Sequence, residues 1–202
     1  MPRRPTALEQ GALDGLCGVY SIVNGIVWAL RTYPHPRPQK QGRRRPSDEE
    51  LGDLFIVLLS NLVRGHSHLK PIVEGTNSRQ LFRLLSKSSD WLRKHRGLAL
   101  VTRRPFHGRP YVPTTQVAQK LGRHLVRPGT AAILGIEAPF DHWTVVRQVA
   151  QQRLLLLDSA GTSQLSMKTW GEGCSRKTGL IHPDNIFLLE LTKSKRARKA
   201  VA

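Results

Sequence analysis

Long apolar runs, acidic side chains and cysteines are all scarce in this chain of 202 residues. A membrane-spanning helix needs about 20 consecutive apolar residues. The nearest candidate, Leu51 to Val63, is interrupted by glycine, aspartate, serine and asparagine. The basic N-terminus has no contiguous apolar segment before Gln10, as a secretory signal would have. We therefore expect a cytoplasmic protein without a membrane span, and delivery by a secretion system stays open.

Cysteine occurs only twice, at Cys17 and Cys174. This spacing fits neither a zinc site nor a Cys-x-x-Cys redox pair, and a disulfide would require an oxidising compartment. His66 and His68 lie one residue apart, but no further ligands lie close to them in the sequence. We therefore predict free thiols, a solvated loop around the two histidines, and no metal ion or cofactor.

Acidic residues are outnumbered by basic ones. The chain has 32 Lys and Arg residues against 14 Asp and Glu residues, a formal net charge of +18. Such a surplus attracts polyanions. The basic residues are scattered, with denser runs at residues 43–45, 103–104 and 193–199, and no nucleic-acid-binding motif surrounds them. Nucleic acid and an acidic protein or peptide are candidate partners, and a solvated basic surface also explains the charge.

Apolar residues at helical spacing dominate the first half of the chain. Ser47 and Glu50 form a capping box, and Gly97 follows a basic cluster that suits the end of a helix. Gly25 either loosens the first helix or permits close packing. Three helices are predicted: residues 16–32, a helix from Ser47 to near Gly65, and a helix from Thr76 or Asn77 to the residue before Gly97.

The second half of the chain has the sequence pattern of a β-sheet. Short apolar runs bounded by polar turns predict strands at residues 98–102, 130–136, 142–149, 153–158 and 185–191. A helix starting at Thr114 or Thr115 and running through Leu125 interrupts this series.

The order of elements, helices first and an antiparallel sheet second, indicates an α+β fold. We expect one domain over residues 1–192, with a helical part at about 10–96 and a sheet part at about 97–192. An active site would lie in the cleft between the two parts. Residues 193–202 form a basic tail that is too charged to pack, so we expect it to be disordered.

Cys17 stands where a reactive thiol is expected. A turn at Gly15 leads into the first helix, so Cys17 lies at or near the N-terminus of that helix. Unpaired backbone N–H groups and the helix dipole favour a thiolate there. The amide of Gln10, seven residues earlier, could donate a hydrogen bond to an oxyanion beside the sulfur.

His142 and Asp158 occupy the two ends of a predicted hairpin. His142 opens the first strand, and Asp158 ends the second after a short turn. The start of one antiparallel strand lies beside the end of the other, so an imidazole and a carboxylate come into contact range. His142 would then take the proton of Cys17, and Asp158 would orient the ring. Gln10 and the backbone N–H of Cys17 would bind the oxyanion.

The residues Gln10, Asp14-Gly-Leu-Cys17-Gly18 and His142-Trp143, with Asp158-Ser159, together resemble papain-like cysteine peptidases. The closer likeness is to the bacterial branch that contains the peptidase domains of bacteriocin exporters. The resemblance implies a papain-like fold and cleavage of peptide or isopeptide bonds through a thioacyl-enzyme. It also implies that Cys17 is the nucleophile, His142 the base, Asp158 the orienting acid and Gln10 the oxyanion donor.

Several alternatives stay open at this level. Asp141 or Asp184 could replace Asp158, and His124 or His182 could serve as the base. Trp143 is expected to pack beside the site. An amine could replace water as the acyl acceptor, which would make the protein an acyltransferase. A basic nucleic-acid-binding protein and a catalytically silent papain-like interaction module are the alternatives outside enzyme chemistry.

Overall fold

The computed structural model describes residues 7–10, 15–34, 46–64, 70–137, 141–171, 173–175 and 180–194. The loop histidines at positions 66 and 68, the glycine at position 11, and residues 195–202 lie outside these ranges. The start of the expected tail is corrected, because Lys193 pairs with Leu98 at the end of the last strand. The backbone N–H of Ser194 also donates to Gly97 O at 3.0 Å.

Three of the four described N-terminal helices follow the sequence signals closely, and the short α3 (Lys70–Glu74) was not predicted. The other three are α1 (Cys17–Thr32), α2 (Asp48–Val63) and α4 (Ser78–Arg96). Ser47 and Glu50 make both hydrogen bonds of the predicted capping box. Asn77, rather than Thr76, caps α4. Gly97 ends α4 with a φ of 63°, the left-handed conformation that glycine adopts without strain.

The sheet is antiparallel and six-stranded, in the order β1-β8-β3-β4-β5-β6. Its strands are β1 (Leu98–Arg103), β3 (Thr130–Ile136), β4 (His142–Ala150), β5 (Arg153–Leu157), β6 (Gln164–Ser166) and β8 (Ile181–Lys193). A separate two-stranded sheet joins β2 (Tyr111–Pro113) to β7 (Gly173–Ser175). Helix α5 (Thr114–Leu125) and a 3-10 turn (Met167–Trp170) complete the described elements.

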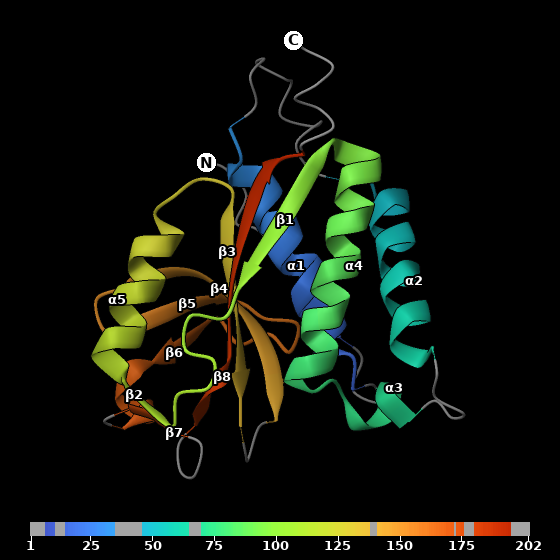
Figure 1. Ribbon diagram of the computed structural model, residues 1–202. Coiled ribbons are helices and arrows are strands. Elements are labelled where there is room, and N and C mark those ends of the chain that lie inside the picture. Colours follow the sequence, from blue (N-terminus) through green and yellow to red (C-terminus); the bar gives the residue numbers. More distant parts are fainter. Residues whose placement is uncertain are drawn as a thin grey trace.

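Helices cover both faces of the large sheet (Figure 1). Alternate residues of β3 belong to two separate apolar clusters: Ala131 and Ile133 pack toward α1, whereas Ala132 and Leu134 pack toward α5. The α+β class is therefore confirmed. We expected a helical part and a sheet part lying side by side. Instead, α1 lies against β3 and β4 on one face of the sheet, and α5 packs on the opposite face of the same sheet. A strand that is buried on both faces carries a continuous apolar run, as β3 does.

Two glycines permit close approach to α1. A Cβ on Gly25 would lie 3.3 Å from Leu189 Cδ1, so this glycine lets α1 pack tightly on the sheet. A Cβ on Gly15 would lie 2.6 Å from Gly75 N and 2.7 Å from Val73 O, both backbone atoms. Gly15 N–H also donates to Ile72 O. The segment before α1 is thus fixed against the segment that links α3 to α4.

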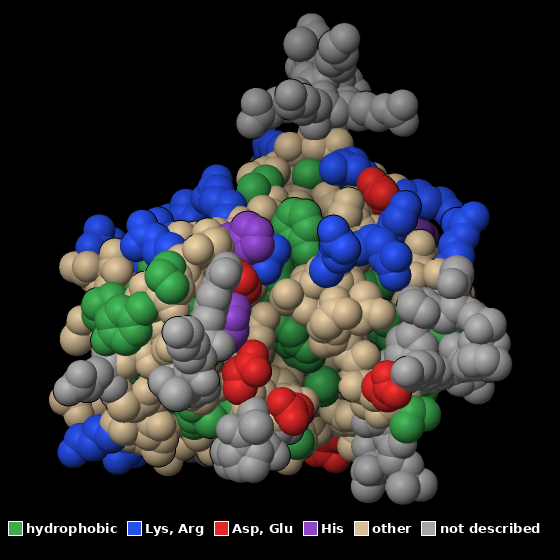
Figure 2. Space-filling model, turned by 60° about the horizontal axis from the view of Figure 1, so that its bottom comes forward, with side chains coloured by type: hydrophobic (Ala, Val, Ile, Leu, Met, Phe, Trp, Pro, Cys, Tyr) green, Lys and Arg blue, Asp and Glu red, His purple; other side chains and the backbone are tan. Residues whose placement is uncertain are grey.

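Basic side chains are spread widely over the surface, as Figure 2 shows for one face of the molecule. In the described part of the chain, no helix is both long and apolar enough to cross a membrane.

Candidate active site

Cys17 is the first residue of α1. Its exposed fraction is 5%, and it is a free thiol, as is Cys174. Leu16 at the N-cap provides no side-chain cap, so no capping side chain covers the positive end of the helix dipole beside the sulfur. A Cβ on Gly18 would approach Thr76 Cβ to 2.9 Å, so glycine is needed for α1 to begin this close to Thr76. The predicted place of Cys17 at the helix start is confirmed.

The hairpin of β4 and β5 brings His142 to Asp158. His142 Nε2 lies 2.5 Å from Asp158 Oδ1. The contact is diagonal rather than directly across, because the pairing of Val145 with Leu157, when continued, sets Asp158 opposite Thr144. Residues 142 and 144 point to the same face of the strand, so the imidazole still reaches the carboxylate.

Helix α1 is tied to the same strand. Ser21, one turn after Cys17, donates its hydroxyl proton to the carbonyl oxygen of Trp143 at 2.7 Å. Trp143 Nε1 in turn donates to Thr76 O at 2.5 Å. Trp143 therefore packs beside the site, as expected, and also links β4 to the segment before α4. These bonds set the position of Cys17 relative to His142.

The electrostatics of His142 favour its charged form. Burial lowers its pKa, but hydrogen bonds to Asp158 and to Cys17 outweigh burial and raise the pKa to about 9. Since Nε2 faces Asp158, Nδ1 is the ring nitrogen left for the thiol. Burial raises the pKa of Asp158, but the hydrogen bond from His142 and that from the Thr162 N–H lower it below its ordinary value. The arrangement suits an imidazolium held by the Asp158 carboxylate beside the sulfur of Cys17.

These shifts determine how the pair contributes to stability as pH changes. The folded pKa of His142 is raised, so its contribution is complete below its ordinary value of 6.5 and is lost as the pH rises through about 9. The folded pKa of Asp158 is lowered, so its contribution is present above 3.8 and is lost as the pH falls through the lowered value. The ion pair is therefore intact at neutral pH.

Gln10 lies next to Asp158 rather than in the wall of the cleft. Its backbone N–H donates to Ser159 O at 3.0 Å, and its Oε1 accepts from Ser159 Oγ at 3.3 Å. Asn24 on α1 fixes the same segment through two hydrogen bonds with the backbone of Leu8. Asn24 was not identified from the sequence, and Ser159, named there only as the neighbour of Asp158, was given no role of its own.

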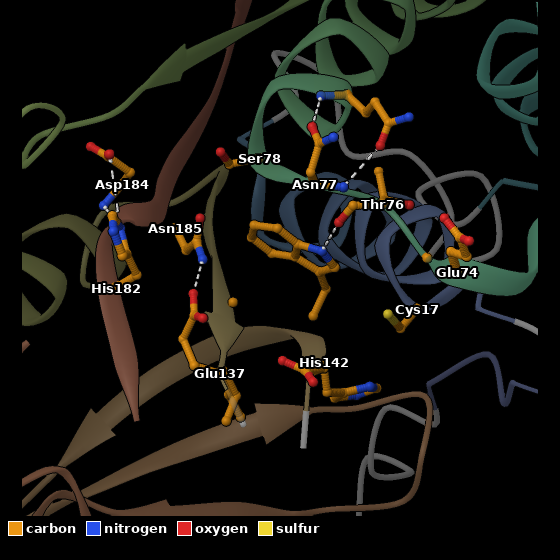
Figure 3. Close-up of a pocket in the computed structure, with 16 residues that line it drawn as sticks. Cys17, Glu74, Thr76, Asn77, Ser78, Glu137, His142, His182, Asp184 and Asn185 are labelled. Atoms are coloured by element: carbon orange, nitrogen blue, oxygen red, sulfur yellow. Dashed lines mark hydrogen bonds and ion pairs between the residues drawn. The ribbon is translucent and has the colours of Figure 1, made fainter. Parts of the chain in front are cut away.

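A cleft of about 650 Å³ opens beside Cys17 and His142 (Figure 3). One wall comes from the start of α1 and from residues 74–78, with Gln80. The other wall comes from residues 135–137, 141–143, 182, 184 and 185. In Figure 3 Cys17, at the start of α1, and His142, at the start of β4, lie near each other at one side of this space. The cleft thus lies between the helical part and the sheet, with room for a chain-like substrate beside the thiol.

The alternative residues have other roles. His124 is buried, with Nε2 at 3.1 Å from Ala131 O and 2.9 Å from Leu189 O, and burial lowers its pKa. His182 Nδ1 accepts a hydrogen bond from the backbone N–H of Asp184. Asp184 Oδ1 accepts from Gly108 N–H and contacts His107 Nδ1, both at 2.8 Å. His182, Asp184 and Asp141 line the cleft, but none of them contacts His142 in the described interactions.

The charge of the cleft differs from that of the whole protein. Among the residues that the structure describes, its lining includes Glu74, Glu137, Asp141 and Asp184, and no lysine or arginine. The net charge favoured an acidic substrate, and the described lining of the cleft does not share that positive charge. The cleft gives no support to nucleic acid as its occupant. Among the described residues, no three His, Cys, Asp or Glu side chains are grouped so as to hold a metal ion.

Comparison with known proteins gives little further guidance. No protein-family model and no curated protein matches the sequence. One similar solved structure is the "Crystal structure of a double glycine motif protease from AMS/PCAT transporter in complex with the leader peptide". The match covers 94% of this chain and 93% of that chain, with 15% sequence identity and a TM-score of 0.46. A likeness this distant establishes no shared activity, so the chemistry has to be argued from this chain's own residues.

Proposed function

We propose that this protein is a papain-like cysteine hydrolase that cleaves peptide or isopeptide bonds through a thioacyl-enzyme. The observation that carries the proposal is the row formed by Cys17, His142 and Asp158 at the edge of an open cleft. A nucleophile, a base and a group that orients the base are the three parts that such chemistry needs.

The roles follow from the geometry. His142 Nδ1 accepts the proton of Cys17, and the resulting imidazolium is held by Asp158. The thiolate attacks the carbonyl carbon of the scissile amide, and a tetrahedral intermediate forms. His142 then gives the proton to the leaving nitrogen as the C–N bond breaks. Water, deprotonated by His142, attacks the thioester, and the acid product leaves with the free thiol restored.

The tetrahedral intermediate carries a negative oxygen that needs hydrogen-bond donors. The backbone N–H of Cys17 lies at the start of α1, where the helix dipole also favours negative charge. We assign this group as one donor. The side-chain amide of Gln10 is the proposed second donor, and to act it has to reach the oxyanion from beside Asp158, outside the wall of the cleft. Ser159 binds Gln10 through both its backbone and its side chain, which would hold that amide in place.

The proposal is tested by digesting a complex peptide mixture with wild-type protein and with Cys17→Ala. New peptide ends are detected by mass spectrometry. We expect cleavage products with the wild type and a loss of at least about 1000-fold in Cys17→Ala, because the nucleophile is removed. Cys174→Ala is the matched control, since Cys174 lies in β7 and does not line the cleft. It should cleave like the wild type.

Equal product formation by wild-type protein and Cys17→Ala would contradict the proposal. Trapping adds a second readout that does not require the right peptide. An aldehyde-terminated peptide should form a reversible adduct with Cys17, seen as a mass increase that is absent in Cys17→Ala. An adduct on Cys174 instead of Cys17 would contradict the proposal that Cys17 is the nucleophile.

A further inference from the structure

Carboxylates are more frequent in the lining of the cleft than the composition of the whole chain would predict. With 32 basic and 14 acidic residues, a random selection of surface would contain more than two basic side chains for each acidic one. Within the described part of the chain, the lining of the cleft has four acidic side chains and no lysine or arginine. Figure 2 brings the bottom of the view in Figure 1 forward, and there acidic side chains lie near one another below the middle, with basic ones above them and toward the edges.

The four carboxylates come from separate elements and surround the cleft. Glu74 ends α3, Glu137 follows β3, Asp141 precedes β4, and Asp184 belongs to β8. In Figure 3, Glu74 is drawn beside Cys17, and Glu137 projects from the opposite, sheet side. The acidic side chains are spread along the cleft rather than converging on one point, in keeping with the missing three-residue metal cluster among the described residues. This spacing suits an extended ligand with several positive charges.

Glu137 is held in place for such a contact. Asn185 Nδ2 donates to Glu137 Oε1 at 2.7 Å, and the backbone N–H of Glu137 donates to Leu180 O at 2.8 Å. An amide donor on one oxygen fixes the carboxylate plane and leaves the second oxygen for a ligand. Asp184, by contrast, is bonded to the loop at His107 and Gly108 and contributes mainly its charge.

For a ligand bound in the cleft, the nearby carboxylates matter more than the surplus of basic residues on the rest of the surface. At physiological ionic strength the Debye length is about 8 Å, so charges on the far surface are largely screened. Carboxylates that line the cleft lie within contact distance of an occupant and are screened least. Electrostatic complementarity then favours cations in the cleft even though the whole protein is strongly basic.

We infer that the cleft selects basic peptides, with lysine or arginine side chains close to the scissile bond and one of them bound by Glu137. The inference rests on the proposed function, since it names the substrate class of the same site. Residues 193–202 of this chain, Lys-Ser-Lys-Arg-Ala-Arg-Lys-Ala-Val-Ala, supply a ready basic probe peptide for testing it.

Charged thiol reagents measure the potential beside Cys17 without a known substrate. Trimethylammonioethyl and sulfonatoethyl methanethiosulfonate carry opposite charges and react by the same disulfide exchange. Their rates at Cys17, each divided by the rate with a small free thiol, should favour the cation by at least about 10-fold. Glu137→Gln should reduce this ratio severalfold. Glu49→Gln, an exposed glutamate on α2 away from the cleft, is the matched control and should leave the ratio unchanged.

Protection by peptides tests the substrate class itself. Neutral iodoacetamide labels Cys17 in the presence of the 193–202 peptide or of a version with every Lys and Arg replaced by Glu. The basic peptide should slow labelling and the acidic one should not, and Glu137→Gln should weaken the protection.

The outcomes separate the two proposals. Faster reaction of the anionic reagent, or protection by the acidic peptide alone, would overturn the inference on substrate class and leave the thiol chemistry standing. Slow labelling by neutral iodoacetamide that does not depend on His142 would overturn the proposed function, whatever the charge preference of the cleft.

Discussion

Iodoacetamide at pH 7 should modify Cys17 more than about 1000-fold faster than Cys174. Cys174 is fully buried in β7, and burial raises its pKa to about 12. A thiol with that pKa is ionised to only about one part in 100,000 at pH 7, and the thiolate is the reactive form. Cys17 lines the cleft and lies close enough to His142 to help raise the pKa of that ring. Mass spectrometry of the labelled peptides gives the two rates.

The unfolded protein supplies the control for this comparison. In concentrated urea both cysteines lose their surroundings and should react at similar rates. Comparable labelling of both cysteines in the folded protein would contradict the distinction between an activated thiol and an inert one. Faster labelling of Cys174 would contradict it more severely, because that residue has no base beside it in the described structure.

Asp158→Asn should lower the labelling rate of Cys17 at pH 7.5 by about 10- to 100-fold. The carboxylate is the main group that raises the pKa of His142 against burial. With a neutral amide in its place, burial is opposed only by Cys17, and the His142 pKa should fall by roughly 2 units. The imidazolium that stabilises the thiolate is then lost at neutral pH. Labelling rates measured from pH 5 to pH 10 reveal this as a shift of the whole profile.

A second aspartate near a histidine provides the matched control. Asp53 on α2 accepts a hydrogen bond from Trp91 Nε1 and lies 3.7 Å from His95 Nε2, remote from the cleft. Asp53→Asn should leave the labelling profile of Cys17 unchanged. If Asp158→Asn labels at the wild-type rate across the same pH range, Asp158 does not stabilise the imidazolium and the assigned role is wrong.

Much of the fold is encoded in local signals, of which the Ser47 capping box was predicted and the cap of α4 was left open between Thr76 and Asn77. The capping boxes at Ser47 and Asn77 fix the starts of α2 and α4 because each cap satisfies the helix's own N–H groups. Strand β3 matches its predicted range because its apolar run is bounded by polar residues. Local rules work where the stabilising partners lie within a few residues.

Other elements depend on distant partners. Strands β2, β6 and β7 have three residues each and exist because neighbouring strands supply their hydrogen bonds. Strand β8 begins at Ile181, four residues earlier than predicted, although Pro183 cannot donate a ladder hydrogen bond. Ile181 pairs with Ile136 beyond a register shift in β3, and a sequence pattern does not reveal such a pairing.

The candidate site likewise has features that the sequence predicts and features that depend on distant partners. Hairpin topology alone brings His142 near Asp158, so that contact could be predicted, although its diagonal register could not. The bond from Ser21 to Trp143 joins residues 122 positions apart and has no sequence signature. The acidic lining is assembled from residues between positions 74 and 184, each ordinary by itself. For this reason the net charge of the chain does not give the charge of the cleft.

The titration of His142 tests the central claim most directly. Its ring signal in an NMR spectrum, assigned by its loss in His142→Gln, can be followed from pH 5 to pH 11. An imidazolium held between Asp158 and Cys17 should stay protonated at pH 7.5 and titrate with a midpoint at about 9. A midpoint at or below the ordinary value of 6.5 would show a neutral imidazole at physiological pH and would contradict the ion pair on which the proposed chemistry depends.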